Sequence, residues 1–181
     1  MSFSRPRKTY EESELYEYAV GALARRMRSV AELKRLLRQR VESDTEYGQT
    51  LVELVIRRLK DQGYLNDARY AVAYSSYRRD NEKFGRYRVI TDLKAKGVHA
   101  EVIDRAVTSA YGEVDEEAQA RAYLRRKRLA KPKDQKQAAR IFRQMARAGF
   151  GTKTIFGILK KWEVDDECLG ALESGITSAQ E

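Results

Sequence analysis

Cysteine, proline and histidine are scarce in this 181-residue sequence, which holds one, two and one of them, respectively. The single cysteine, Cys168, cannot form an intramolecular disulfide, as is typical of proteins from a reducing cytoplasm. The single histidine, His99, follows Val98 at a predicted helix start, where a surface position is the simpler interpretation. Neither residue has the neighbours that a nucleophile or a zinc site needs. We therefore expect no catalytic residues, no metal and no cofactor, and we predict that the protein is not an enzyme.

Long apolar stretches are also missing. No run approaches the roughly 18 residues that a membrane-spanning helix needs, and the chain does not open with a signal-peptide pattern. We expect a cytoplasmic protein without a membrane partner. Runs of β-branched residues are equally scarce, so the sequence does not favour a sheet.

Charge is abundant and unevenly placed. Charged residues make up 35 % of the sequence, and the net charge is +9. All 36 Lys and Arg lie at or before Lys161, and six of the 27 acidic residues follow it, so the first 162 residues carry +15 and the rest −6. A basic body of this kind predicts a polyanionic partner, either nucleic acid or an acidic protein surface.

Apolar residues recur at helical spacing along nearly the whole chain, which predicts nine short helices and an all-α fold. Most of these stripes are strongly apolar, whereas the seventh rests on Ala118 and Ala122 alone. The nine helices fall into three groups of three, so we predict three tandem three-helix repeats that share apolar surface and form an elongated, curved molecule. The expected boundaries are 1–65 for an N-terminal extension with the first repeat, 66–113 for the second, 114–162 for the third and 163–181 for an acidic tail.

The stretch "LKDQGYLNDARYA" predicts the joint between the first two repeats. Gly63 can end a helix in the left-handed conformation with Tyr64 packed back onto Leu59, and Asn66 or Asp67 can cap the next helix. The same stop recurs in later repeats. The residues with a predicted structural role are Leu59, Gly63, Tyr64, Asp67, Tyr70, Leu93, Gly97 and Gly149.

Three stretches carry a resemblance to a known family. "VIRRLKDQGYLNDARYA", followed by "GRYRVITDLKAKGV", resembles the core signature of the RecX family, the regulators of the RecA recombinase. The upstream "ALARRMRSVAELKRLL" is similar to the first-repeat pattern of that family, in which Ser29 and Glu32 form a capping box. The likeness runs from Val20 to Trp162.

The resemblance implies a protein without a catalytic centre that binds in the helical groove of the RecA filament on DNA, and we expect it to act as a monomer. It implies restraint of the filament's ATPase, strand-exchange and coprotease activities, together with weaker direct binding of single- or double-stranded DNA. The sequence leaves open whether the protein inhibits or assists RecA, and whether it caps filament ends or coats the groove.

Basic residues are the candidate binding residues, since clusters of arginine favour forked contacts to carboxylates and phosphates. For any one cluster a solvated helix face is about as good an interpretation, but all of them on a +15 body favour anion recognition. Tyr77 and Tyr87 stand beside arginines, and the sequence leaves base stacking open for both. The predicted RecA- and DNA-binding residues are Arg57, Arg58, Arg79, Lys83, Arg86, Arg88, Lys94, Lys96, Arg125, Arg126 and Lys127.

Two other functions remain compatible with these residues. A helical protein could bind the phosphate backbone of DNA without RecA, and its affinity would then fall steeply with salt. A helical-repeat adaptor for another acidic protein would bind neither DNA nor RecA.

Overall fold

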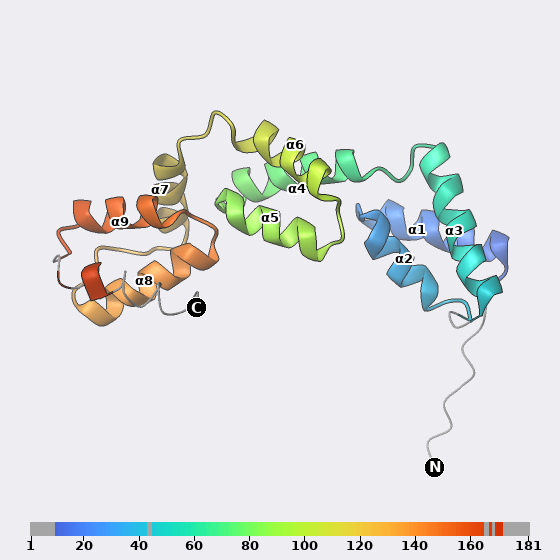
Figure 1. The fold of residues 1–181 in the computed structure, drawn as a ribbon, viewed down its shortest axis with the longest axis horizontal. Helices are drawn as coiled ribbons and strands as arrows, with labels where there is room; N and C mark the ends of the chain where they lie inside the picture. Colours follow the sequence, from blue (N-terminus) through green and yellow to red (C-terminus); the bar gives the residue numbers. More distant parts are fainter. Residues whose placement is uncertain (1–9, 43–44, 165–166, 168, 172–181) are drawn as a thin grey trace, which may run out of the picture. The chain divides into compact units, whose positions relative to one another are not determined.

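A computed structural model of the chain describes residues 10–42, 45–164, 167 and 169–171. These residues form helices and no strand (Figure 1), which confirms the predicted all-α class. Cys168 and most of the predicted acidic tail lie outside the described residues. In chain order the helices are α1 (Glu12–Arg25), α2 (Val30–Arg38), α3 (Glu46–Asp61), α4 (Asp67–Asp80), α5 (Arg86–Ala95), α6 (Ala100–Tyr111), α7 (Glu116–Arg126), α8 (Gln135–Arg147) and α9 (Thr152–Lys161).

Residue contacts divide the chain into two compact units. Unit 1 comprises Met1–Ala71 and Leu93–Ile103, and unit 2 comprises Val72–Asp92 and Asp104–Glu181. Helices α4, α5 and α6 therefore each contribute residues to both units. The residue boundaries that we expect for the three repeats stay a prediction.

The core of unit 1 is built from one face of each of α1, α2 and α3, which contact one another (Figure 1). Its members recur three or four positions apart, as the apolar stripes predicted. Burying each large apolar side chain stabilises the fold by about 1.5–3 kcal/mol. The fully or nearly fully buried residues are Leu15, Ala19, Ala22, Leu33, Leu37, Val52, Val55, Ile56 and Leu59.

Ser29 is completely buried at the start of α2. Its Oγ accepts a hydrogen bond from the N–H of Glu32 at 3.1 Å, and the Glu32 carboxylate accepts one from the N–H of Ser29 at 3.1 Å, so the predicted capping box is confirmed. The same hydroxyl donates to the backbone carbonyl of Lys96 at 2.6 Å. Ser29 thus joins the start of α2 to the end of α5, two segments far apart in the sequence.

Three glycines end helices in the left-handed conformation, with φ of 73° at Gly63, 74° at Gly97 and 89° at Gly149. The N–H of the residue after each glycine binds a carbonyl five positions back, as in the predicted Schellman motif. These N–H to carbonyl pairs are Tyr64 to Leu59 (2.9 Å), Val98 to Leu93 (3.2 Å) and Phe150 to Met145 (3.3 Å).

The prediction that the Tyr64 side chain packs onto Leu59 is wrong. Tyr64 is 59 % exposed, whereas Leu65 is buried and belongs to the same core cluster as Leu59. The N–H of Leu65 also reaches the Leu59 carbonyl, at 3.2 Å, so the turn carries the purely apolar side chain inward and leaves the tyrosine in solvent. Tyr70, by contrast, is buried as predicted.

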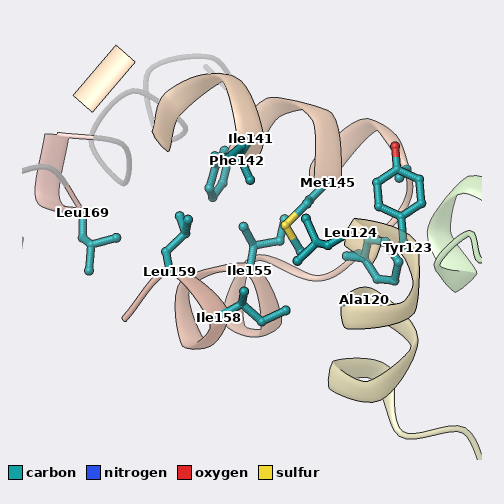
Figure 2. Close-up of a cluster of buried hydrophobic side chains, with 12 residues drawn as sticks. Ala120, Tyr123, Leu124, Ile141, Phe142, Met145, Ile155, Ile158, Leu159 and Leu169 are labelled. Atoms are coloured by element: carbon teal, nitrogen blue, oxygen red, sulfur yellow. The ribbon is translucent and has the colours of Figure 1, made fainter. Parts of the chain in front are cut away.

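The core of unit 2 contains side chains of α7, α8 and α9 that point toward one another (Figure 2). The apolar stripe predicted for α7 is wrong: Ala118 is exposed, and the buried face consists of Ala120, Tyr123 and Leu124. The sequence pattern did not include Tyr123, because a tyrosine has a polar hydroxyl as well as a large apolar ring. In the structure this ring packs in the core, with its centroid 5.5 Å from that of the Phe150 ring. Leu169, from the predicted acidic tail, is buried in the same core.

Candidate functional site

The eleven predicted binding residues are distributed over both units. Unit 1 holds Arg57, Arg58, Lys94 and Lys96, and unit 2 holds Arg79, Lys83, Arg86, Arg88, Arg125, Arg126 and Lys127. Their surroundings differ, and the difference separates side chains that stabilise the fold from side chains that are available to a partner.

Arg79 serves the fold of unit 2. Its guanidinium donates to the carbonyl of Ala110, near the end of α6, and to the carboxylate of Asp80 at 2.7 Å. The hydrogen bond to Asp80 raises the pKa of Arg79. The last carbonyls of a helix have no hydrogen-bond donor within the helix, and Arg79 supplies one. We therefore assign Arg79 mainly a structural role rather than a binding role.

Lys96 and Arg126 are also paired. The Lys96 amino group lies 2.9 Å from the carboxylate of Glu32, which also accepts from the hydroxyl of Tyr70 at 3.2 Å. Burial opposes ionisation of Glu32, but the hydrogen bonds from Lys96 and Ser29 outweigh burial and lower the pKa of Glu32. Arg126 lies 3.2 Å from Glu82. The charges of Lys96 and Arg126 are thus largely compensated within the protein.

Asp92 lies at the centre of a cluster of polar side chains that the sequence analysis did not predict. It lies 2.9 Å from Arg88 and 3.1 Å from Arg78, and it accepts a hydrogen bond from the Tyr74 hydroxyl at 2.9 Å. The Arg78 guanidinium also lies 5.2 Å from the centroid of the Phe84 ring. The spacing of four residues between Arg88 and Asp92 on one helix was a usable signal for their ion pair; Arg78 lies on another helix and gave none.

The start of α5 is held by the end of α8. The N–H of Gly85 donates to the Ala148 carbonyl at 2.9 Å, and the N–H of Tyr87 donates to the Gly149 carbonyl at 3.2 Å. The approach is so close that a Cβ on Gly149 would lie 2.1 Å from the backbone nitrogen of Arg88. The helix stop at Gly149 therefore also positions the basic start of α5.

Most of the remaining predicted binding residues have no carboxylate partner among the described residues. Arg58 is intermediate between the paired and the unpaired cations. It lies 3.8 Å from Glu12, but both side chains are about half exposed, and such an exposed ion pair contributes little to stability. We call the remaining set the unpaired cations. They are Arg57, Arg86, Lys94, Arg125 and Lys127. Lys83 is left out because its charge, after the hydrogen bond from Arg79, helps to lower the pKa of Asp80.

The tyrosines that the sequence left open are both accessible. Tyr77 and Tyr87 are each 56 % exposed. Tyr74, by contrast, is half-buried, and its hydroxyl donates a hydrogen bond to Asp92. Of the two, Tyr87 has an unpaired cation close by: the guanidinium carbon of Arg86 lies 5.9 Å from its ring centroid.

Neither a metal centre nor a membrane span is found in the described part of the chain. No three His, Cys, Asp or Glu side chains there are grouped so that they could hold a metal ion. Each helix of that part is too short or too polar to cross a bilayer.

Comparison with known proteins shows which family this chain resembles. Residues 66–107 match the family description "RecX, second three-helix domain". The chain is 34 % identical over 172 residues to the regulatory protein RecX of Myxococcus xanthus, covering 87 % of each chain. It is 32 % identical over 148 residues to that of Pseudomonas putida strain W619, covering 82 % of this chain and 90 % of the relative.

Solved structures show the same fold. The crystal structure of RecX from Lactobacillus salivarius superposes with a TM-score of 0.62 at 19 % identity, covering 84 % of this chain and 96 % of the other. A second crystal structure, of a regulatory protein RecX, gives a TM-score of 0.61 at 22 % identity over 83 % of this chain and 71 % of the other.

Proposed function

The chain belongs to the RecX family, and from this premise we propose that it modulates the RecA recombinase. It binds in the groove of the RecA–DNA filament and inhibits ATP turnover, strand exchange and coprotease activity. The unpaired cations carry this proposal, because an exposed arginine without an internal carboxylate keeps its full charge for a partner.

The two units give the protein two attachment regions. Unit 1 presents Arg57 and Lys94, and unit 2 presents Arg86 and Arg125. A chain that engages two neighbouring RecA protomers binds more tightly than either region alone, because the second contact forms at high effective concentration. Bridged protomers resist the rearrangement that ATP turnover requires, which would account for inhibition without any catalytic residue.

We also propose that the protein acts as a monomer in the cytoplasm, without enzymatic activity and without a cofactor. The lone cysteine supports the reducing compartment. The family supports a regulatory rather than a catalytic role.

The test follows ATP hydrolysis by RecA filaments preformed on single-stranded DNA while the protein is added. The double variant Arg86→Glu with Arg125→Glu should need about tenfold more protein for half-inhibition, since each lost contact is worth about 0.5–1 kcal/mol and repulsion adds to it. The matched control is Lys136→Glu with Arg140→Glu, which makes the same change of charge on exposed positions of α8. Equal loss in both variants would contradict the assigned site.

Direct binding to DNA is the second candidate, and exposed Tyr87 beside unpaired Arg86 favours it. An excess of free DNA in the ATPase assay separates the two. Inhibition that persists supports recognition of the filament, whereas inhibition that disappears indicates competition for phosphates. A steep decline with salt, also seen without RecA, would indicate the same.

A further inference from the structure

A cavity of about 170 Å³ opens in unit 2 beside the unpaired cation Arg86. Its wall is formed where α5 begins, α6 ends and α7 begins, three places that are separate in the sequence. The lining residues used below are Arg86, Tyr87, Tyr111, Glu116 and Gln119. None of the roles assigned so far uses this cavity.

The inner wall is held in place by hydrogen bonds to backbone. The Tyr111 hydroxyl donates to the carbonyl of Phe84 at 3.0 Å, and the Gln119 amide donates to the carbonyl of Arg79 at 2.7 Å. Because these side chains are already fixed, a ligand would not have to order them, and less affinity would be lost on binding.

The mouth of the cavity combines an open aromatic ring with a cation. Tyr87 is 56 % exposed, and the Arg86 guanidinium lies near its ring without a carboxylate partner among the described residues. An exposed ring that is anchored at its backbone offers a stacking face, and a neighbouring arginine offers a phosphate contact. The N–H of Tyr87 is anchored in this way by the Gly149 carbonyl.

Glu116 restricts what can enter the cavity. Its carboxylate accepts hydrogen bonds from the N–H of Gly151 at 2.9 Å and from the hydroxyl of Thr154, so it is held at the wall. A carboxylate at this position repels an acidic side chain or a phosphate. The same carboxylate can accept a hydrogen bond from the exocyclic amino group of a neutral base. The phosphate attached to such a base would then remain outside the cavity, next to Arg86.

We propose that this cavity is a subsite for one unpaired base of single-stranded nucleic acid, stacked on Tyr87 with its phosphate on Arg86. A duplex keeps both faces of each base stacked, so only an unpaired base can present a face to the tyrosine. The inference deepens the proposed contact with nucleic acid and rests on it.

The experiment measures fluorescence anisotropy of a labelled 20-nucleotide oligo(dC) without RecA. Tyr87→Leu should weaken binding by about 5- to 100-fold, the loss typical of removing one stacking side chain. Tyr77→Leu is the matched control, since Tyr77 is equally exposed but does not line the cavity, and it should bind like the wild type. Tyr87→Phe keeps the ring and should bind within about twofold.

An abasic strand of the same length tests the base itself. The wild type and Tyr87→Leu should bind it equally weakly, because no base is present to stack. Arg86→Gln should lower the dependence on salt by about one phosphate on either strand. Equal binding of oligo(dC) by Tyr87→Leu and wild type would overturn the subsite, and so would wild-type binding of the abasic strand as tightly as oligo(dC).

The RecA ATPase assay separates failure of this inference from failure of the proposed function. Loss of oligo(dC) binding in Tyr87→Leu supports the subsite whether or not inhibition of RecA is retained. Unchanged oligo(dC) binding, in a protein that still inhibits RecA, overturns the subsite and leaves the proposed function standing. Circular dichroism of each variant verifies the helical fold.

Discussion

The Oδ1 atom of Asp67 accepts a hydrogen bond from the backbone N–H of Val30 at 2.8 Å. Asp67 begins α4 and Val30 begins α2, so Asp67, one of the two residues predicted as a cap for α4, caps α2 instead. Its own helix is capped by Asn66, whose side-chain oxygen accepts from the N–H of Arg69 at 3.0 Å. Adjacent residues at the joint thus serve two helix starts that are 37 positions apart.

Asp67→Ala should lower the free energy of unfolding by about 1–3 kcal/mol, because it removes a charged acceptor from a helix N–H that has no intrahelical partner. Urea unfolding, followed by circular dichroism, measures the change. Asp61→Ala, at an exposed position of α3, should change stability by no more than about 0.5 kcal/mol. Equal effects of the two substitutions would show that the bond to Val30 contributes nothing.

Glu32 should make stability depend on pH at the acid end. Its pKa in the folded protein lies below the ordinary value of 4.5, so its ionised form is favoured by folding. The contribution is therefore complete above pH 4.5 and is lost as pH falls through the lower folded pKa. Unfolding measured from pH 6 to pH 3 should show the wild type's advantage over Glu32→Gln shrinking as pH falls. A constant difference would contradict the prediction.

Gly149→Ala should destabilise unit 2 severely. The left-handed φ of 89° disfavours a Cβ, and that atom would also lie 2.1 Å from the backbone nitrogen of Arg88. We expect a loss of more than about 3 kcal/mol, because backbone strain and a clash combine. Gly157→Ala lies within α9, where the added Cβ would meet no other part of the protein within 4 Å, and it should instead raise stability by about 0.5–1 kcal/mol. Thermal unfolding of both variants provides the comparison.

Ser75, in α4, places a hydroxyl group in the protein interior. Its Oγ is completely buried and has no hydrogen-bond partner in the described part of the chain. Ser75→Ala should therefore raise the free energy of unfolding by about 1 kcal/mol or more, since an unsatisfied buried hydroxyl is costly. Ser76→Ala gains the same helix propensity at a partly exposed position and should gain less. Equal gains in stability for the two variants would show that the effect comes from helix propensity alone and not from the buried hydroxyl.

The binding residues were only partly readable from the sequence. Charge and clustering identified arginines, but they could not distinguish Arg86 from Arg79. Arg86 has no carboxylate partner among the residues that the structure describes, whereas Arg79 donates to the carbonyl of Ala110. That difference depends on atoms 31 positions away. Lys96 illustrates the same point, because the carboxylate that compensates it belongs to Glu32, 64 positions away. The ion pair of Arg88 with Asp92, four residues apart on one helix, could have been found.

Local physical chemistry determined the secondary structure of this protein. Apolar spacing, the capping box at Ser29 and the left-handed glycines act within a single helix or turn, so the sequence alone was enough to predict them, apart from the buried face of α7. Tertiary structure decided which neighbour a side chain finds. It buried Leu65 and left Tyr64 exposed, placed Asp67 at the start of α2, and brought Arg86, Tyr87 and Glu116 around one cavity. These outcomes depend on contacts between distant segments, which no local pattern encodes.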